Sequence, residues 1–173
     1  MTPSHAVSVV LDDDLLTFNR VVGVVRRRNL PIEGLSAGPG DAPGVLRLSM
    51  LVQTDPAGAE RMLRQLEKTH GVRQAAVYPA AEAVAREVAL IKVRVPSQDG
   101  AALRAAVSRC GATVVEESAG AVIVEIGGDR EATRGLIEAL QKFGIIEVAR
   151  SGAVTLRGAS PAGATTHPSE AVL

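Results

Sequence analysis

Aromatic side chains are scarce in this chain of 173 residues, which has two Phe, one Tyr and no Trp. Any core must therefore be aliphatic, and hydrophobic residues do make up 46% of the sequence. An RNA-binding sheet displays aromatic side chains for base stacking, yet the strand-like runs 7–11 and 45–52 contain none. The formal net charge is zero, so no basic field attracts a phosphate backbone. The sequence disfavours nucleic acid as a partner.

Cysteine is nearly absent as well. The single Cys110 excludes an internal disulfide and a cysteine metal cluster. It falls on the apolar face of a predicted helix with Leu103 and Ala106, which favours core packing over nucleophilic catalysis. No apolar run approaches the roughly 18 residues that span a bilayer, and no signal peptide opens the chain, so we expect a cytoplasmic protein. The histidines are too scattered for a ligand set: His5, His70 and His167.

One order of elements occurs twice along the chain: strand, helix, strand, strand, helix, strand. Strand–helix–strand units with right-handed crossovers, joined by a hairpin, give the split βαβ arrangement. The predicted fold class is therefore α+β, with two tandem ferredoxin-like βαββαβ domains. We expect them at 1–79 and 86–157, with an alanine-rich linker at 80–85 and a disordered tail at 158–173.

Each predicted sheet has one face covered by helices and one face left open. In the first domain the open face is not polar, because Leu35, Val45 and Leu51 are expected there. Domains this small bury only about 60% of the surface of the unfolded chain. We therefore expect the open face to be buried against another copy or a partner.

Two charged runs flank the first predicted helix, which starts at 15. Carboxylates at 12–14 suit the positive end of the helix, with Asp14 as N-cap, although they could instead bind a divalent cation. Arginines at 26–28 suit the last turn, although they could instead contact an acidic partner or a nucleotide. The apolar residues expected to face the sheet recur at helical spacing: Leu15, Phe18, Val22 and Val25.

No motif of bond chemistry is recognisable. Neither a phosphate-binding loop nor a dinucleotide fingerprint is present, and no paired titratable groups stand out. What remains is the free backbone N–H groups after residue 11, which could receive the carboxylate of an amino acid. This signal is generic by itself.

Several stretches resemble a known family. Two stretches resemble the first ACT domain of acetolactate (acetohydroxyacid) synthase small subunits: Arg20-Val21-Val22-Gly23 and Ile32-Glu33-Gly34-Leu35. Residues 86–93 resemble the strand that opens the C-terminal domain of these subunits. Residues 146–152, followed by 156–158, resemble the closing signature of the same domain. The similarity runs in order along nearly the whole chain.

The resemblance implies a non-catalytic regulatory subunit. Family members bind the catalytic large subunit of acetolactate synthase, raise its activity and confer feedback inhibition by valine, leucine or isoleucine. Thiamine diphosphate and Mg belong to the catalytic partner, so no cofactor is expected on this chain. ACT domains of the family pair edge to edge as a homodimer, and the amino acid binds at that interface.

The same resemblance implies an effector pocket near the first loop and helix. Three positions depart from the family: Asp13 and Leu16 replace the usual Asn and Gly, and Pro31 replaces a frequent Asn. Leu16 fills space that Gly leaves for a ligand, and Asp13 loses an amide donor. We therefore predict weakened, altered or lost feedback. The residues expected to line the pocket are Asp13, Leu15, Leu16, Thr17, Pro31 and Ile32.

Two other classes of protein stay open at this point. A stand-alone sensor with tandem ACT-like domains would bind its amino acid without a catalytic partner. A free-standing enzyme on a ferredoxin-like fold would need a cleft with paired titratable groups.

Overall fold

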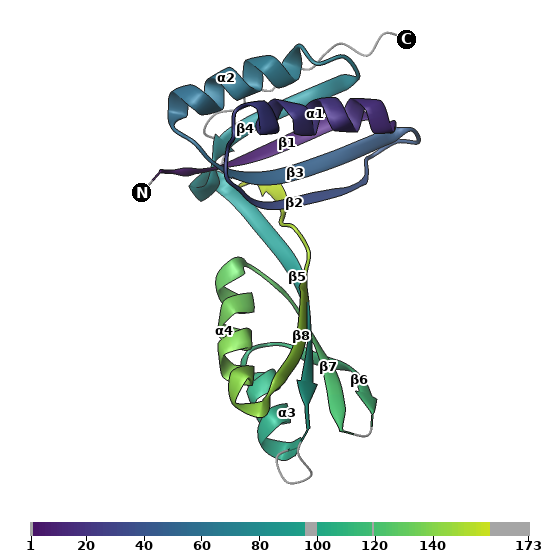
Figure 1. Ribbon diagram of the computed structural model, residues 1–173, viewed down its shortest axis with the longest axis vertical. Coiled ribbons are helices and arrows are strands. Elements are labelled where there is room, and N and C mark those ends of the chain that lie inside the picture. The colour runs from purple at the N-terminus through teal and green to yellow at the C-terminus, as the bar shows by residue number, and fades with distance from the viewer. Residues whose placement is uncertain (1, 96–99, 119, 160–173) are drawn as a thin grey trace.

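The computed structural model describes residues 2–95, 100–118 and 120–159, which form two βαββαβ domains placed end to end (Figure 1). The predicted tail lies outside these residues from position 160 onward. The first domain contains β1 (Ser4–Asp12), α1 (Leu15–Arg27), β2 (Ile32–Pro39), β3 (Val45–Gln53), α2 (Pro56–Glu67) and β4 (Val72–Pro79). The second contains β5 (Ala83–Arg94), α3 (Gly100–Arg109), β6 (Thr113–Ser118), β7 (Ala121–Gly128), α4 (Arg130–Leu140) and β8 (Ile145–Arg150).

The first sheet is antiparallel with the strand order β2-β3-β1-β4. Both α1 and α2 lie on the side away from the second domain (Figure 1). The core between sheet and helices is aliphatic, as the scarcity of aromatic residues predicted. Its members without exposed surface include Val7, Val9, Leu11, Val21, Leu48, Met50, Met62 and Leu66.

The buried stripe of α1 differs from the predicted one. The helix buries Thr17, Val21, Val24 and Val25, whereas Leu15 is 76% exposed. At 3.6 residues per turn, Leu15 lies about 160° around the helix axis from Thr17 and faces away from the sheet. Phe18 and Val22 flank the stripe and are partly buried, so the prediction was wrong for Leu15.

A β-bulge at Glu33 changes which side chains of β2 face the helices. Ile32 pairs with Val52, but the next paired residue, Gly34, faces Leu51. One extra residue in a strand reverses the alternation of faces beyond it. Leu35 therefore pairs with Met50 on the helix side and packs against the core, so its expected place on the open face was wrong.

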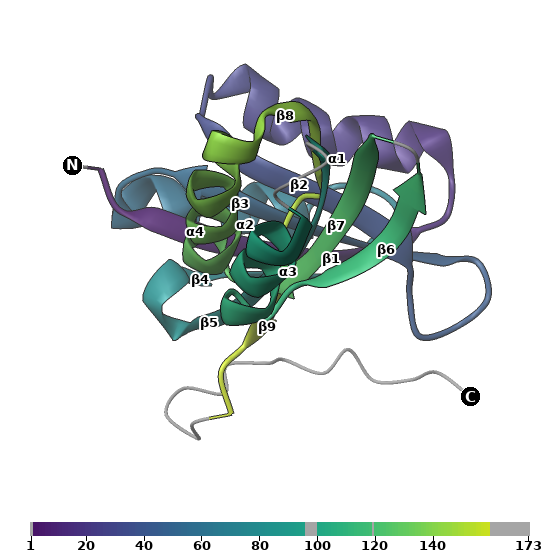
Figure 2. The same cartoon turned by 90° about the horizontal axis from the view of Figure 1, so that it is seen from below.

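The second sheet has the strand order β6-β7-β5-β8, and α3 and α4 cover one of its faces (Figures 1 and 2). Leu103 and Ala106 of α3 are buried in its core, together with Ile91 and Leu136. Cys110 packs against this core, partly buried and as a free thiol.

The two domains are joined by a continuous strand. The predicted linker at 80–85 forms a 3-10 turn (Ala80–Glu82) followed by the start of β5. The first four residues of β5, 83–86, pair with a further strand, β9 (Val154–Arg157), and residues from Ala89 onward lie inside the second sheet. We refer to residues 83–86 and 154–157 together as the ribbon.

The ribbon lies on the open face of the first sheet. The backbone N–H of Thr155 is 3.4 Å from Ser49 Oγ of β3, and both residues are buried. The face under it carries small side chains such as Ser8 and Ala6, which allow close approach of the ribbon. The chain itself thus covers much of the face that was expected to meet another copy or a partner.

Candidate functional site

The three carboxylates at the end of β1 have separate environments. Asp14 Oδ1 accepts a hydrogen bond from the Thr17 backbone N–H at 2.8 Å, so Asp14 is the N-cap of α1 as predicted. Asp12 Oδ1 accepts from Arg73 Nε at 2.7 Å. The side chain of Asp13 is exposed, and its backbone N–H donates to the Gly44 carbonyl at 3.0 Å. Among the described residues no group of three or more acidic, His or Cys side chains could hold a metal ion. The observed cap at Asp14 agrees with the helix-capping interpretation.

The protonation of Asp14 is coupled to this cap. Hydrogen bonds from the Thr17 hydroxyl and the Thr17 backbone N–H stabilise the carboxylate and hold the pKa of Asp14 below its ordinary value. The anionic form therefore predominates at neutral pH, where it also suits the positive end of the helix.

Four of the six predicted effector residues lie together where β1 meets α1. Leu15 is 76% and Leu16 60% exposed, and the Asp13 side chain beside them faces solvent. Thr17 differs, because it is buried and in contact range of Gly71, whose φ of 85° suits glycine. A side chain at position 71 would overlap Thr17. Thr17 is therefore a packing and capping residue here.

The other two predicted effector residues, Pro31 and Ile32, lie at the opposite end of the same sheet. Asp12 pairs in register with Val45 on β3, whereas Ile32 pairs in register with Val52. Seven residues of strand separate these levels, which is about 24 Å. One chain therefore does not assemble the predicted pocket.

Strand β2 offers a way to bring the two groups together. It lies at the edge of the first sheet and pairs with β3 alone among the described strands. Pro39, at its far end, is level with Leu46 and hence with Leu11, next to the loop that holds Asp13. If two copies paired antiparallel through β2, Ile32 of one copy would approach Pro39 of the other. Pro31 and Ile32 of one copy would then approach Asp13, Leu15 and Leu16 of the other.

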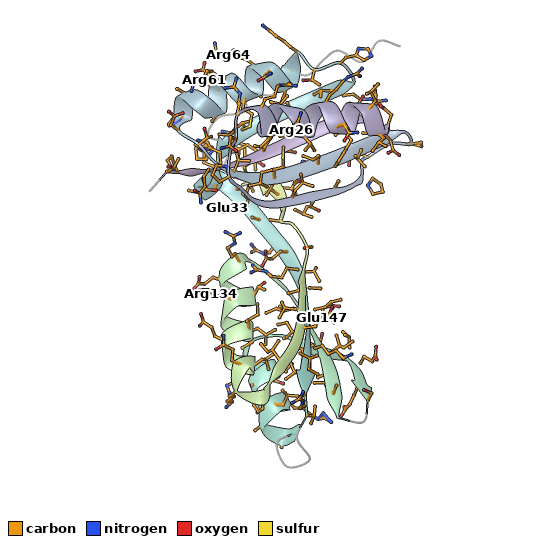
Figure 3. The ribbon with its side chains drawn as sticks, in the orientation of Figure 1. Arg26, Glu33, Arg61, Arg64, Arg134 and Glu147 are labelled. Atoms are coloured by element: carbon orange, nitrogen blue, oxygen red, sulfur yellow. The ribbon has the colours of Figure 1, made fainter. Side chains whose placement is uncertain are left out.

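The domain junction contains a charged contact that links β2 to the second domain. Arg130 Nη1 donates to Glu33 Oε2 at 2.9 Å, and Nη2 donates to the Glu33 carbonyl at 2.8 Å. Gln53 Nε2 donates to the other carboxylate oxygen at 2.9 Å, so both oxygens of Glu33 are occupied. Figure 3 shows Glu33 at the lower side of the first domain, facing the second.

Further contacts fix the return of the chain toward the first domain. Gly152, between β8 and β9, lies so close to the backbone of Leu35 that a Cβ atom would overlap its carbonyl group. Arg150 forms an ion pair with the buried Glu87, and Arg157 forms one with Glu82.

The second sheet leaves one face open. Val88 and Leu90 of β5 are 47% and 41% exposed there, and the face continues with Ile123 of β7. Lys92 and Glu147, which are paired in register between β5 and β8, border it. Glu147 is labelled in Figure 3. No described element covers this apolar face with its charged border, an arrangement typical of a surface that binds another protein.

A second group whose pKa is shifted among the described residues lies on α4. Glu131 raises the pKa of the Arg134 guanidinium through a hydrogen bond, but both groups are exposed on α4. Across the described part of the chain, no helix is both long and apolar enough to cross a membrane. The sites that the structure does offer are suited to binding a ligand or another protein.

Sequence reasoning missed the domain junction. Arg130 and Glu33 are 97 residues apart, and no periodicity relates one to the other. Gly152 was visible as part of the closing motif, and a glycine between two short strands is a signal of close backbone approach.

Comparison with known proteins gives matches for both domains. Residues 86–158 match the family described as the small subunit of acetolactate synthase, and residues 17–74 match the AHAS small subunit-like ACT domain. The acetolactate synthase small subunit of Mycobacterium leprae is 30% identical over 154 residues, covering 89% of this chain and 91% of that protein. The corresponding protein of Mycolicibacterium smegmatis is 31% identical over 155 residues, covering 90% and 91%.

A solved structure has the same two-domain architecture. The crystal structure of the acetolactate synthase small subunit from Thermotoga maritima is similar with a TM-score of 0.79 and 27% identity. The similarity covers 89% of this chain and 96% of that one. The predicted α+β fold and the resemblance stated from the motifs are thereby confirmed.

Proposed function

Because the chain belongs to the acetolactate synthase small-subunit family, we propose that it binds and activates the thiamine-diphosphate-dependent catalytic subunit. Family membership makes it a regulatory subunit of acetolactate synthase in branched-chain amino-acid biosynthesis. The observation that carries the proposal is the match of both domains in succession, over almost the full length of the relatives. In this proposal thiamine diphosphate and Mg are held by the catalytic subunit and none by this chain.

The proposed regulatory unit is a homodimer paired through β2. The free edge of β2 supports this pairing, as does the exposed apolar surface at Leu15, Leu16 and Ile32. Pairing would bury these side chains and bring the two ends of the predicted effector pocket together. An amino acid bound there would favour one arrangement of the dimer and so shift the activity of the complex.

We further propose that this site senses branched-chain amino acids weakly or with altered preference. The Leu16 side chain, which is exposed, lies where the family usually has Gly, and so occupies space at the start of α1. The exposed carboxylate of Asp13 would oppose the carboxylate of an amino acid, although it could receive the ammonium group.

The test is reconstitution with the cognate catalytic subunit. Acetolactate formation is measured with the catalytic subunit alone, with this chain alone, and with both, each with and without valine. We expect no turnover by this chain, clear activation in the mixture, and weak inhibition by valine. If the chain binds valine but neither associates with nor activates the catalytic subunit, a stand-alone amino-acid sensor is the better interpretation. Turnover by the chain alone would overturn both.

A further inference from the structure

A cationic side chain that forms no ion pair with any described residue lies on the face of the first sheet that is remote from α1 and α2. Arg47 of β3 is level with Val10 of β1 and Gly38 of β2. Its Nη2 donates to Ser8 Oγ at 3.2 Å. In the described part of the chain Arg47 forms no ion pair, and its buried Nε finds no acceptor. A buried donor is costly to leave without an acceptor, so we expect a water molecule or a ligand to supply one.

Arg47 also lines a cavity of about 150 Å³ on this face. The hydroxyl-bearing residues Ser36 and Ser49 lie in its wall, and Val154 of β9 supplies an apolar surface. Gly38 keeps space free, since a Cβ atom there would meet nothing within 4 Å. Among the described residues, the lining contains one cation and no carboxylate: Ser36, Gly38, Pro39, Arg47, Ser49 and Val154.

We propose that this cavity binds a small aliphatic monocarboxylic acid that lacks an ammonium group. The guanidinium fork matches the geometry of a carboxylate, and the hydroxyls of Ser36 and Ser49 can donate to its oxygens. Val154 would contact the aliphatic part. An α-amino acid is disfavoured, because its ammonium group would find no carboxylate in the lining and would lie near the Arg47 charge.

This site is distinct from the predicted effector pocket and goes beyond the proposed function. It contains none of the six effector residues, and it opens on the ribbon side of the sheet, whereas Leu15 and Leu16 belong to α1 on the other side. Because Val154 belongs to β9, a bound acid would also contact the ribbon that joins the domains.

The test uses the full chain labelled with ¹⁵N and two probes that differ only in the amino group, isovalerate and valine. Acetate serves as a smaller carboxylate, and sodium chloride at equal ionic strength controls for screening. We expect isovalerate to produce saturable shifts at the amides of Ser36, Gly38, Arg47 and Ser49. Valine should produce shifts at these amides that are at least tenfold smaller.

Variants assign the effect to the guanidinium. Arg47→Gln should abolish saturation, and Arg47→Lys should weaken binding without abolishing it. Arg26→Gln removes the same charge from an exposed position of α1 (labelled in Figure 3) and should bind isovalerate as the unmodified chain does. Dispersed amide signals outside the cavity verify that each variant is folded.

Two results would overturn the proposal. One is the absence of saturable shifts with both acetate and isovalerate in the unmodified chain, which requires no variant to fold. The other is equal binding of isovalerate by Arg47→Gln, or of valine and isovalerate at these amides. The outcome is independent of acetolactate formation, so it is distinguishable from a failure of the proposed function.

Discussion

Arg130, the first residue of α4, holds Glu33 of β2 through both its carboxylate and its backbone carbonyl, at 2.9 and 2.8 Å. Glu33 is the bulged residue of β2 and directly follows Ile32, one of the predicted effector residues. The contact therefore ties the edge strand that we propose to pair in the dimer to the second domain. A movement of β2 at that edge would therefore displace a residue that α4 contacts directly.

Replacing Arg130 tests this link. Arg130→Gln should lower the free energy of unfolding by less than about 1 kcal/mol, because the Arg130 side chain is 53% exposed and exposed ion pairs contribute little. Amide exchange at Gly34 and Leu35 should nevertheless become faster, because the carbonyl and carboxylate of Glu33 lose their anchor. Arg134→Gln is the matched control, since Arg134 pairs within its own helix. Unchanged exchange in β2 would show that the contact does not restrain the strand.

Gly152 tests the second contact between the domains. Gly152→Ala should destabilise the protein by about 1–3 kcal/mol, since the new methyl group would overlap the Leu35 carbonyl and displace the backbone. The control is Gly135→Ala on the exposed side of α4, where a Cβ atom meets nothing within 4 Å. That change should stabilise the helix by roughly 0.5–1 kcal/mol. Urea unfolding of both variants measures the difference, and equal stability would contradict the packing argument.

The order of elements could be predicted from the sequence because each element carries its own local signal. The N-cap at Asp14 and the strand at 45–52 depend on residues close in the chain, and both were confirmed. Two of the failures depend on contacts between distant residues. The bulge at Glu33 reversed the faces of β2, and β5 continued through the expected linker because residues 83–86 pair with β9.

The candidate site shows the same division. Asp13, Leu15 and Leu16 could be placed together at the end of β1, since they are adjacent in the chain. In the proposed dimer they approach Ile32 of a second copy, about which one sequence carries no geometric information. The junction between Arg130 and Glu33 depends on how two separately predictable domains are oriented.

The open face of the second sheet is expected to bind the catalytic subunit. Leu90→Lys should raise the concentration of this chain needed for half-maximal activation at least tenfold, because a lysine cannot be buried against an apolar partner as leucine can. Leu90 is 41% exposed, so stability should change by less than about 0.5 kcal/mol. Val84→Lys, at a similarly exposed position in the ribbon, is the comparison. If Leu90→Lys activates normally, the partner binds elsewhere.

The cap of α1 predicts a pH dependence of stability. The pKa of Asp14 is lowered from 3.8 in the folded protein by its hydrogen bonds to Thr17. This stabilisation is therefore complete above the unfolded pKa and is lost as the pH falls through the folded pKa. Asp14→Asn retains a capping oxygen without the charge. The urea concentration at the midpoint of unfolding should be higher for the unmodified chain than for the variant at pH 7. The two midpoints should become equal in acid. A difference that is independent of pH would assign it to another cause.

The prediction of weak amino-acid binding depends on the exposed side chains of Asp13 and Leu16. Replacing both with the residues usual in the family should change amino-acid sensing. Asp13→Asn with Leu16→Gly restores the residues usual in the family and should strengthen valine binding at least tenfold, measured by calorimetric titration. Removing Leu16 clears space at the start of α1, and Asn removes a charge that repels the ligand carboxylate. Leu15→Gly is the control, because it makes the same change one residue earlier and shares any cost of glycine in a helix. Tighter binding by both would indicate a general loosening of the helix start. Micromolar valine binding by the unmodified chain would contradict the prediction outright, because Asp13 and Leu16 would then be compatible with a fully formed effector site.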